Sequence, residues 1–208
     1  MKRNPAHSSI SGGLIRGVSN LLPKLLVVNL LTFIFCIPLV TAGASLCAMH
    51  DCLLKILRET DDRLGRQFLQ SFRQNWKQAT LLWLPFLMIF AAALVDILIV
   101  LIAPDVLAEW VVVPAISAAI AALLLFQFVM PMQAHFENTA LNILRSAAIL
   151  SVSRLPKTVL MAALGVLPVF LFLKVTLSWP LLFLFGLSLP GYFCAKLYNP
   201  VFLELEES

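Results

Sequence analysis

Charged residues are scarce in this sequence of 208 residues, and long stretches have almost none. Lys, Arg, Asp and Glu make up 12% of the chain, against about 25% in a typical soluble domain. Four stretches hold at most one charge each: 25–49 and 111–134 hold none, 79–103 holds Asp96, and 158–195 holds Lys174. About 20 apolar residues in a helix cross a hydrocarbon core roughly 30 Å thick. The chain is therefore predicted to be an all-α, multi-span membrane protein, which excludes most soluble enzymes.

Other common features are also missing. The sequence has no Ser- or Gly-rich linker and no low-complexity tract, so we expect one integral-membrane domain over residues 1–208. Its four cysteines lie in or beside apolar stretches, where cysteine behaves as a small hydrophobe rather than as part of a disulfide framework. The net charge of +4 does not indicate nucleic-acid binding, because Lys and Arg cluster beside apolar segments. The expected partner of this surface is the lipid bilayer.

No catalytic constellation is present in the sequence. We find no nucleophile motif, no phosphate-binding glycine loop and no paired carboxylates within the apolar stretches. Cys47, His50, Asp51 and Cys52 form a small cluster that could hold a soft metal ion. No second Cys/His pair follows at a recognised ligand spacing, so a metal site is not favoured. We expect no enzymatic activity, no cofactor and no metal.

Five membrane-spanning helices are predicted, at about 25–49, 79–103, 112–134, 157–175 and 181–198. The last two are divided at Ser178-Trp179-Pro180, a turn-like, aromatic tripeptide suited to a membrane surface. Pro38 and Gly43 predict an interruption in the first span, because proline removes a backbone donor and glycine lowers helix propensity. Either this span is kinked, or it re-enters through 25–37 and returns through 44–57. We favour the kinked span because two half-helices of 12–14 residues would be short.

Basic residues orient these spans. Segment 51–77 carries six Lys and Arg residues and segment 135–157 carries three, whereas 104–110 carries none. The two basic segments and the C-terminus are therefore predicted to face the cytoplasm, and 104–110 the outside. A kinked first span would leave the N-terminal basic residues outside, against the charge rule: Lys2, Arg3, Arg16 and Lys24. A re-entrant first segment would keep them inside.

Two cytoplasmic stretches are predicted to form short helices at the membrane surface. Phe68, Phe72 and Trp76 recur every four residues in 63–78, which favours an amphipathic interfacial helix ahead of the second span. The other reading makes these residues the first turns of that span. In 138–154 the apolar face is predicted to hold four residues: Leu141, Leu144, Ala148 and Val152.

The first 80 residues carry motifs that resemble a known family. Ile37-Pro38-Leu39-Val40-Thr41-Ala42-Gly43 closes the first apolar segment, and Phe72-Arg-Gln-Asn-Trp-Lys-Gln78 precedes the second. Both are similar to elements of the YesL-like family of bacterial integral membrane proteins, although Ala44 stands where the family often has proline. The resemblance implies a five-helix bacterial plasma-membrane protein with a kink at Pro38, Thr41 and Gly43. Such proteins are often encoded among genes for carbohydrate uptake and have no agreed biochemical activity.

Rare polar residues within the apolar stretches are candidate functional residues. Asp96 and Lys174 are expected at similar depth near the outer surface, where they would either form an ion pair at the mouth of a vestibule or snorkel separately. Asn29 and Gln127 are expected to join helices more often than to bind a ligand.

A weaker pattern lies in the second cytoplasmic segment. Importer permeases carry a coupling loop that begins Glu-Ala-Ala, has glycine at the seventh place and ends Leu-Pro at the nineteenth and twentieth. Counting from Glu137, Leu155 and Pro156 occupy the last two places, but the alanine pair and the glycine are absent. These three residues are candidates for docking to a partner. We expect a non-enzymatic accessory component of carbohydrate uptake that binds a sugar-importer permease; the alternative is a small transporter or channel in its own right.

Overall fold

The computed structural model describes residues 5–60, 63–102, 109–174 and 179–207, and every regular element among them is a helix. In chain order these are α1 (Pro5–Cys36), the short 3-10 helix η1 (Leu39–Thr41), α2 (Ala42–Leu57), α3 (Leu64–Ile102), α4 (Glu109–His135), α5 (Ala140–Ser153), α6 (Leu155–Lys174), α7 (Trp179–Phe185) and α8 (Ser188–Glu206). Five segments are long and apolar enough to cross a membrane, and they lie in α1, η1–α2, α3, α4 and α6. The predicted all-α, multi-span architecture is confirmed.

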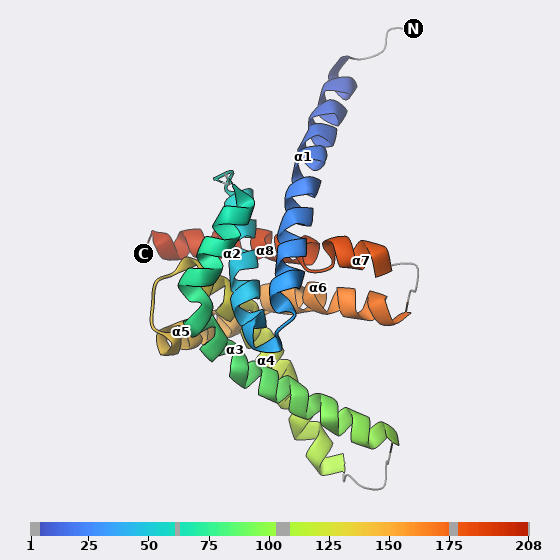
Figure 1. Ribbon diagram of the computed structural model, residues 1–208, viewed down its shortest axis with the longest axis vertical. Helices are drawn as coiled ribbons and strands as arrows, with labels where there is room; N and C mark the ends of the chain where they lie inside the picture. Colours follow the sequence, from blue (N-terminus) through green and yellow to red (C-terminus); the bar gives the residue numbers. More distant parts are fainter. Residues whose placement is uncertain (1–4, 61–62, 103–108, 175–178, 208) are drawn as a thin grey trace.

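The helix α2 lies at the centre of the molecule and contacts α1, α3, α4 and α8 (Figure 1). Eleven of its 16 residues are buried. Its first turns are built from small residues, Ala42-Gly-Ala-Ser45, and small side chains let helices in a membrane protein approach closely. Two groups of helices extend from this centre: α3 with α4, and α6 with α7 and α8 (Figure 1).

The first apolar segment forms a helical hairpin rather than one kinked helix. The α1 helix ends at Cys36, η1 makes the turn, and α2 returns alongside α1 (Figure 1). The Ser45 hydroxyl donates to the Thr32 carbonyl over 2.9 Å, which ties the two arms together. The predicted interruption at Pro38–Gly43 is confirmed, but the preferred kinked span is wrong. The short-helix argument failed because α1 has 32 residues and begins well before residue 25, and α2 has 16, so both arms are longer than the 12–14 residues expected.

Backbone groups released at the hairpin turn are satisfied by nearby side chains. The Thr41 hydroxyl donates to the carbonyls of Phe35 and Pro38 at 3.0 and 2.9 Å. The indole N–H of Trp83, on α3, donates to the Leu39 carbonyl at 2.8 Å. A Cβ added to Gly43 would lie 2.3 Å from the Trp83 Cβ, so glycine is required for α2 and α3 to meet here. The motif residues Pro38, Thr41 and Gly43 thus build the turn.

Residues 63–78 do not form a separate interfacial helix. They are the first turns of α3, which continues without interruption to Ile102. Phe68 is buried and Phe72 packs at 4.8 Å, centroid to centroid, against Phe35 of α1, while Trp76 is exposed. Phe68 and Phe72 therefore pack against α1, which is the physical reason for the difference. Figure 1 shows α3 changing direction along its length, and Pro85 within it removes a backbone hydrogen bond.

The predicted fifth span, 181–198, is divided into α7 and α8 at Gly186. A Cβ on Gly186 would lie 2.3 Å from the Leu182 carbonyl oxygen, so only glycine permits this close approach. Asn29 of α1 satisfies the freed backbone groups. Its side chain accepts from the N–H of Leu187 and Ser188 at 3.0 and 2.9 Å, and donates to the Phe183 carbonyl at 2.8 Å. At the predicted division, Ser178 lies outside the described residues, and Trp179 and Pro180 are the first residues of α7.

Candidate functional site

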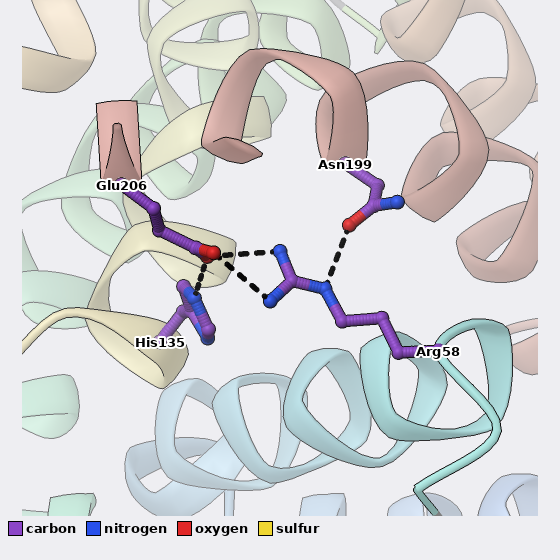
Figure 2. Close-up of polar contacts among 4 residues, drawn as sticks. All are labelled: Arg58, His135, Asn199 and Glu206. Atoms are coloured by element: carbon purple, nitrogen blue, oxygen red, sulfur yellow. Dashed lines mark hydrogen bonds and ion pairs between the residues drawn. The ribbon is translucent and has the colours of Figure 1, made fainter. Parts of the chain in front are cut away.

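The helix ends gather at one polar region, where the last turns of α8 meet α2 and α4 (Figure 2). Arg58, at the end of α2, donates to both carboxylate oxygens of Glu206, at 2.9 and 3.4 Å. Its Nε donates to Asn199 Oδ1 at 2.9 Å. His135, at the end of α4, contacts the same Glu206 oxygen at 2.5 Å. Two residues of α8 therefore hold the ends of two other helices.

The backbone at the end of α2 positions Arg58. Glu59 adopts a left-handed conformation with φ 54°, and the Thr60 N–H donates to the Lys55 carbonyl at 2.9 Å. This is a helix C-terminus closed by a left-handed residue, in which orphan carbonyls are satisfied by the following N–H groups. The chain turns away immediately after Arg58, so its guanidinium extends across the helix end towards α8.

Aromatic packing holds the other side of this cluster. The His135 ring stacks on Phe202 with centroids 5.7 Å apart, and Phe136 packs edge-on to Phe202 at 5.2 Å. Hydrogen bonds from Arg58 and then His135 hold the pKa of the Glu206 carboxyl below its ordinary value. The Glu206 side chain is still 33% exposed, and ion pairs this exposed typically contribute only about 0–1 kcal/mol. The cluster orients helix ends more than it stabilises the fold.

A polar pocket of about 390 Å³ adjoins the cluster and shares His135 with it. Its walls come from α3 and from the end of α4 with the loop that follows. The lining residues are Gln74, Asn75, Gln78, Gln133, Ala134, His135, Phe136, Glu137 and Asn138. Two hydrogen bonds join the walls: Gln133 Nε2 donates to Asn75 Oδ1 at 3.1 Å, and Gln78 Nε2 donates to the Asn138 carbonyl at 2.7 Å. Carboxamides dominate this lining, so it can both donate and accept hydrogen bonds.

The short helix α5 follows the pocket and exposes an apolar face. Thr139 caps its start by accepting from the Asn142 N–H. Its buried residues are Ile143, Ala147 and Ser151. The predicted apolar face is largely turned outward: Leu141 is 58% exposed and Val152 69%. We call the residues Leu141, Ala148, Ile149 and Val152 the α5 face.

Of the candidate docking residues, Glu137 is exposed and lines the pocket, whereas Leu155 and Pro156 are exposed at the start of α6. The 14-residue α5 separates them by about 20 Å, at 1.5 Å per helical residue. Arg154, beside Leu155, pairs with Glu204 of α8 at 2.5 Å. The three residues therefore mark the two ends of α5 rather than one compact site.

Asp96 and Lys174 are not brought together. Asp96 is half-buried on α3 and Lys174 is exposed in the last turn of α6. The far ends of these two helices point in different directions (Figure 1). Within the described part of the chain, the ion pairs lie elsewhere, between Lys55 and Asp51 and around α8.

The remaining predicted residues are placed among packed helices. Asn29 joins α1 to the α7–α8 break, as described above. Gln127 lies between α4 and α6, with its Nε2 3.5 Å from the position of a Cβ on Gly165. His50 contacts the Tyr198 hydroxyl at 3.3 Å, and Asp51 pairs with Lys55 at 2.8 Å. Among the described residues, no three His, Cys, Asp or Glu side chains are grouped to hold a metal ion.

Sequence reasoning missed the cluster around Arg58 and Glu206. Arg58 was counted among the basic residues of segment 51–77 and Glu206 was given no role. Nothing in their spacing indicates a contact between positions 148 residues apart. The pocket gave a weak signal that was overlooked: Gln67, Ser71, Asn75 and Gln78 follow one face of α3 at helical spacing. A polar stripe on a helix that becomes apolar further on marks a surface that faces something polar.

Comparison with known proteins gives one partial match. Residues 25–97 match a family described as Protein of unknown function, DUF624. This region holds the α1–α2 hairpin turn and most of α3, and therefore includes the motif residues from Pro38 to Gly43. No curated protein and no solved structure matches the chain significantly.

Proposed function

We propose that this protein is a non-enzymatic, multi-pass membrane component that works by binding a partner membrane protein through α5. The single observation that carries the proposal is the exposed apolar α5 face, in which Ile149 and Val152 are each 69% exposed. With 14 residues, α5 is shorter than the roughly 20 that cross a bilayer. A contiguous apolar face outside the spans marks a surface that another protein or a membrane covers.

The partner we infer is a transport permease with an apolar groove bordered by acidic residues. Leu141, Ala148 and Val152 recur at intervals that place them along one side of a helix, the arrangement by which helices dock into apolar grooves. Arg145 is exposed and lies within the same side, where it would meet an acidic residue. The YesL-like resemblance supports a permease whose cargo is carbohydrate.

Photo-crosslinking in intact cells tests this proposal. A photoreactive residue at Ile149 or Val152 should capture a permease subunit, identified by mass spectrometry. The matched control is Leu69, an apolar residue of α3 that is 39% exposed and lies outside the α5 face. The control should capture no such subunit. Crosslinks from the α5 face to lipid alone, or to another copy of this chain alone, would contradict the proposal.

Surface variants test whether docking matters for uptake. Ile149→Asp and Val152→Asp should abolish the crosslink while changing the free energy of unfolding by less than about 0.5 kcal/mol, because both side chains are exposed. Uptake of a labelled sugar should fall in cells that carry either variant. If cells that lack the protein take up the labelled sugar at the normal rate, a role in carbohydrate import would be contradicted.

A further inference from the structure

We propose that the pocket between α3 and the end of α4 binds an uncharged small molecule rich in hydroxyl groups. Its volume of about 390 Å³ falls in the range of roughly 300–1,000 Å³ that is usual for small-molecule sites. The pocket is lined by five carboxamide side chains: Gln74, Asn75, Gln78, Gln133 and Asn138. A hydroxyl group both donates and accepts a hydrogen bond, and a carboxamide offers both partners.

A buried acceptor points to a ligand. Gln133 is 5% exposed and lines the pocket. Its Nε2 donates a hydrogen bond to Asn75 Oδ1, but its Oε1 is buried and accepts no hydrogen bond from the described residues. A buried polar atom without a partner costs roughly 1–3 kcal/mol, so such an atom in a pocket wall marks a place where a donor binds. A ligand hydroxyl would supply that donor.

The charges around the pocket exclude other ligand classes. Among the described residues that line it there is no Lys or Arg, and the ionisable ones are His135 and Glu137. His135 contacts Glu206 through Nε2. A phosphate or carboxylate would face Glu137 without a cation to balance it, and a hard divalent cation requires more carboxylate oxygens than Glu137 provides. A neutral ligand is the one that matches carboxamides, and Phe136 offers it an apolar wall.

Two kinds of molecule offer uncharged hydroxyl groups of this kind: a soluble sugar or polyol, and the sugar headgroup of a membrane lipid. The inference is independent of docking by α5, because every group in it belongs to α3, α4 and the loop before Thr139. Absence of the α5 crosslink would not argue against ligand binding in this pocket. Failure to bind a polyol would not argue against docking through α5.

The test is binding to the full chain, purified in a detergent without a sugar headgroup. Glucose, maltose and glycerol are the soluble probes, with glucose 6-phosphate as the charged comparison, measured by saturation-transfer NMR and calorimetry. Phosphatidylcholine nanodiscs with and without a glucosyl diacylglycerol test the lipid source. We expect saturable binding of an uncharged probe from one source, and weaker or no binding of glucose 6-phosphate.

Pocket variants assign the binding to these residues. Gln133→Ala and Gln78→Ala should each weaken it about threefold to tenfold, the loss expected for one hydrogen bond. Gln70→Ala, on an exposed position of α3 outside this pocket, should bind like the wild type. The unfolding midpoint of each variant shows whether it folds. If Gln133→Ala does not fold, the binding test relies on Gln78→Ala. The proposal is overturned if no uncharged probe binds saturably, if glucose 6-phosphate binds as tightly, or if both folded pocket variants bind like the wild type.

Discussion

Asn29 caps the helix that begins at Ser188, although the two residues are 159 positions apart. Its Oδ1 accepts from the N–H of Leu187 and Ser188, groups that have no acceptor within the helix because they lie at its start. Asn29 is itself fully buried. A side chain on α1 thus performs for α8 the task that an N-cap residue usually performs from its own chain segment.

Replacing Asn29 by Leu should therefore destabilise the protein by about 2–4 kcal/mol, since each buried backbone group left without a partner costs roughly 1–3 kcal/mol. The control is Thr32→Val on the same helix. Thr32 is equally buried, but its hydroxyl donates to the Val28 carbonyl of its own helix, so the expected cost is below about 1 kcal/mol. Denaturation in mixed micelles measures both. Equal losses would show that Asn29 acts only by filling space.

A methyl group at Gly43 should separate α2 from α3. Its Cβ would lie 2.3 Å from the Trp83 Cβ and 2.8 Å from the Ala79 carbonyl oxygen. Neither atom belongs to the far end of a flexible side chain, so Gly43→Ala should cost about 1–3 kcal/mol. Gly65→Ala, in a helix with nothing within 4 Å of the new Cβ, should be neutral or stabilise by up to about 1 kcal/mol. Thermal unfolding of the two variants gives the comparison; a stable Gly43→Ala would contradict the close packing.

Acid should weaken the Arg58–Glu206 contact. The folded-state pKa of Glu206 is lowered from an unfolded value of about 4.3. The stabilisation is therefore complete above that value and is lost as the pH falls through the lower folded pKa. The stability difference between wild type and Glu206→Gln should accordingly shrink below about pH 4, and high salt should reduce it at neutral pH.

The neighbouring variant Glu207→Gln is the control for this titration, because the Glu207 side chain makes no ion pair within the described residues. Its difference from wild type should stay small across the same pH range. A Glu206→Gln difference that is constant from neutral pH to pH 3 would mean that the contact does not depend on charge.

The hairpin predicts that both of its flanks lie on the same side of the membrane. In a cysteine-free background, Asn20→Cys, Thr60→Cys and Arg145→Cys should resist an impermeant thiol reagent added outside the cell. Leu107→Cys, in the predicted outer loop, should react, because Lys and Arg concentrate in the segments expected inside. Residue 107 lies outside the described part of the chain. Labelling at position 20 but not at position 60 would restore a single, kinked first span.

Asp96 and Lys174 are expected to behave independently. Because no ion pair joins them and α3 and α6 diverge towards these residues, the effects of Asp96→Ala and Lys174→Ala should add within about 0.5 kcal/mol. A double-mutant cycle on unfolding in detergent measures the deviation. A coupling energy above about 1 kcal/mol would show that the two helix ends meet in the membrane and would restore the predicted charge pair.

The sequence predicted those features that follow from local chemistry. The stretches without charge predicted the long helices. Pro38 and Gly43 predicted the break in the first apolar segment, because both residues act on the backbone directly. The hairpin was harder to foresee, since its arms extend beyond the apolar run into the polar ends of α1 and α2. The distribution of charge indicated the hairpin better than helix length did. Only a re-entrant first segment places Arg16 and Lys24 on the same side as the other basic segments.

Features that depend on distant contacts could not be predicted. The α7–α8 break requires Asn29, which lies far away in the sequence. The buried face of α5 could not be predicted because apolar residues surround that helix, so periodicity could not choose between Ile143 and Leu141. Nothing in the sequence pairs Arg58 with Glu206, and only the fold brings them into contact.

The α1–α2 hairpin has a consequence for how the chain enters the membrane during synthesis. Under the predicted topology both flanks stay on the side where the ribosome works, so the basic residues near the N-terminus need not be translocated. The turn, residues 37–41, is the part of the hairpin farthest from those flanks, and it carries no charge. Moving a charged side chain to the centre of the bilayer costs about 2.5–3.5 kcal/mol even with the translocon's help. The hairpin can therefore insert as one preassembled unit, with its turn already closed by Thr41, before α3 has been made.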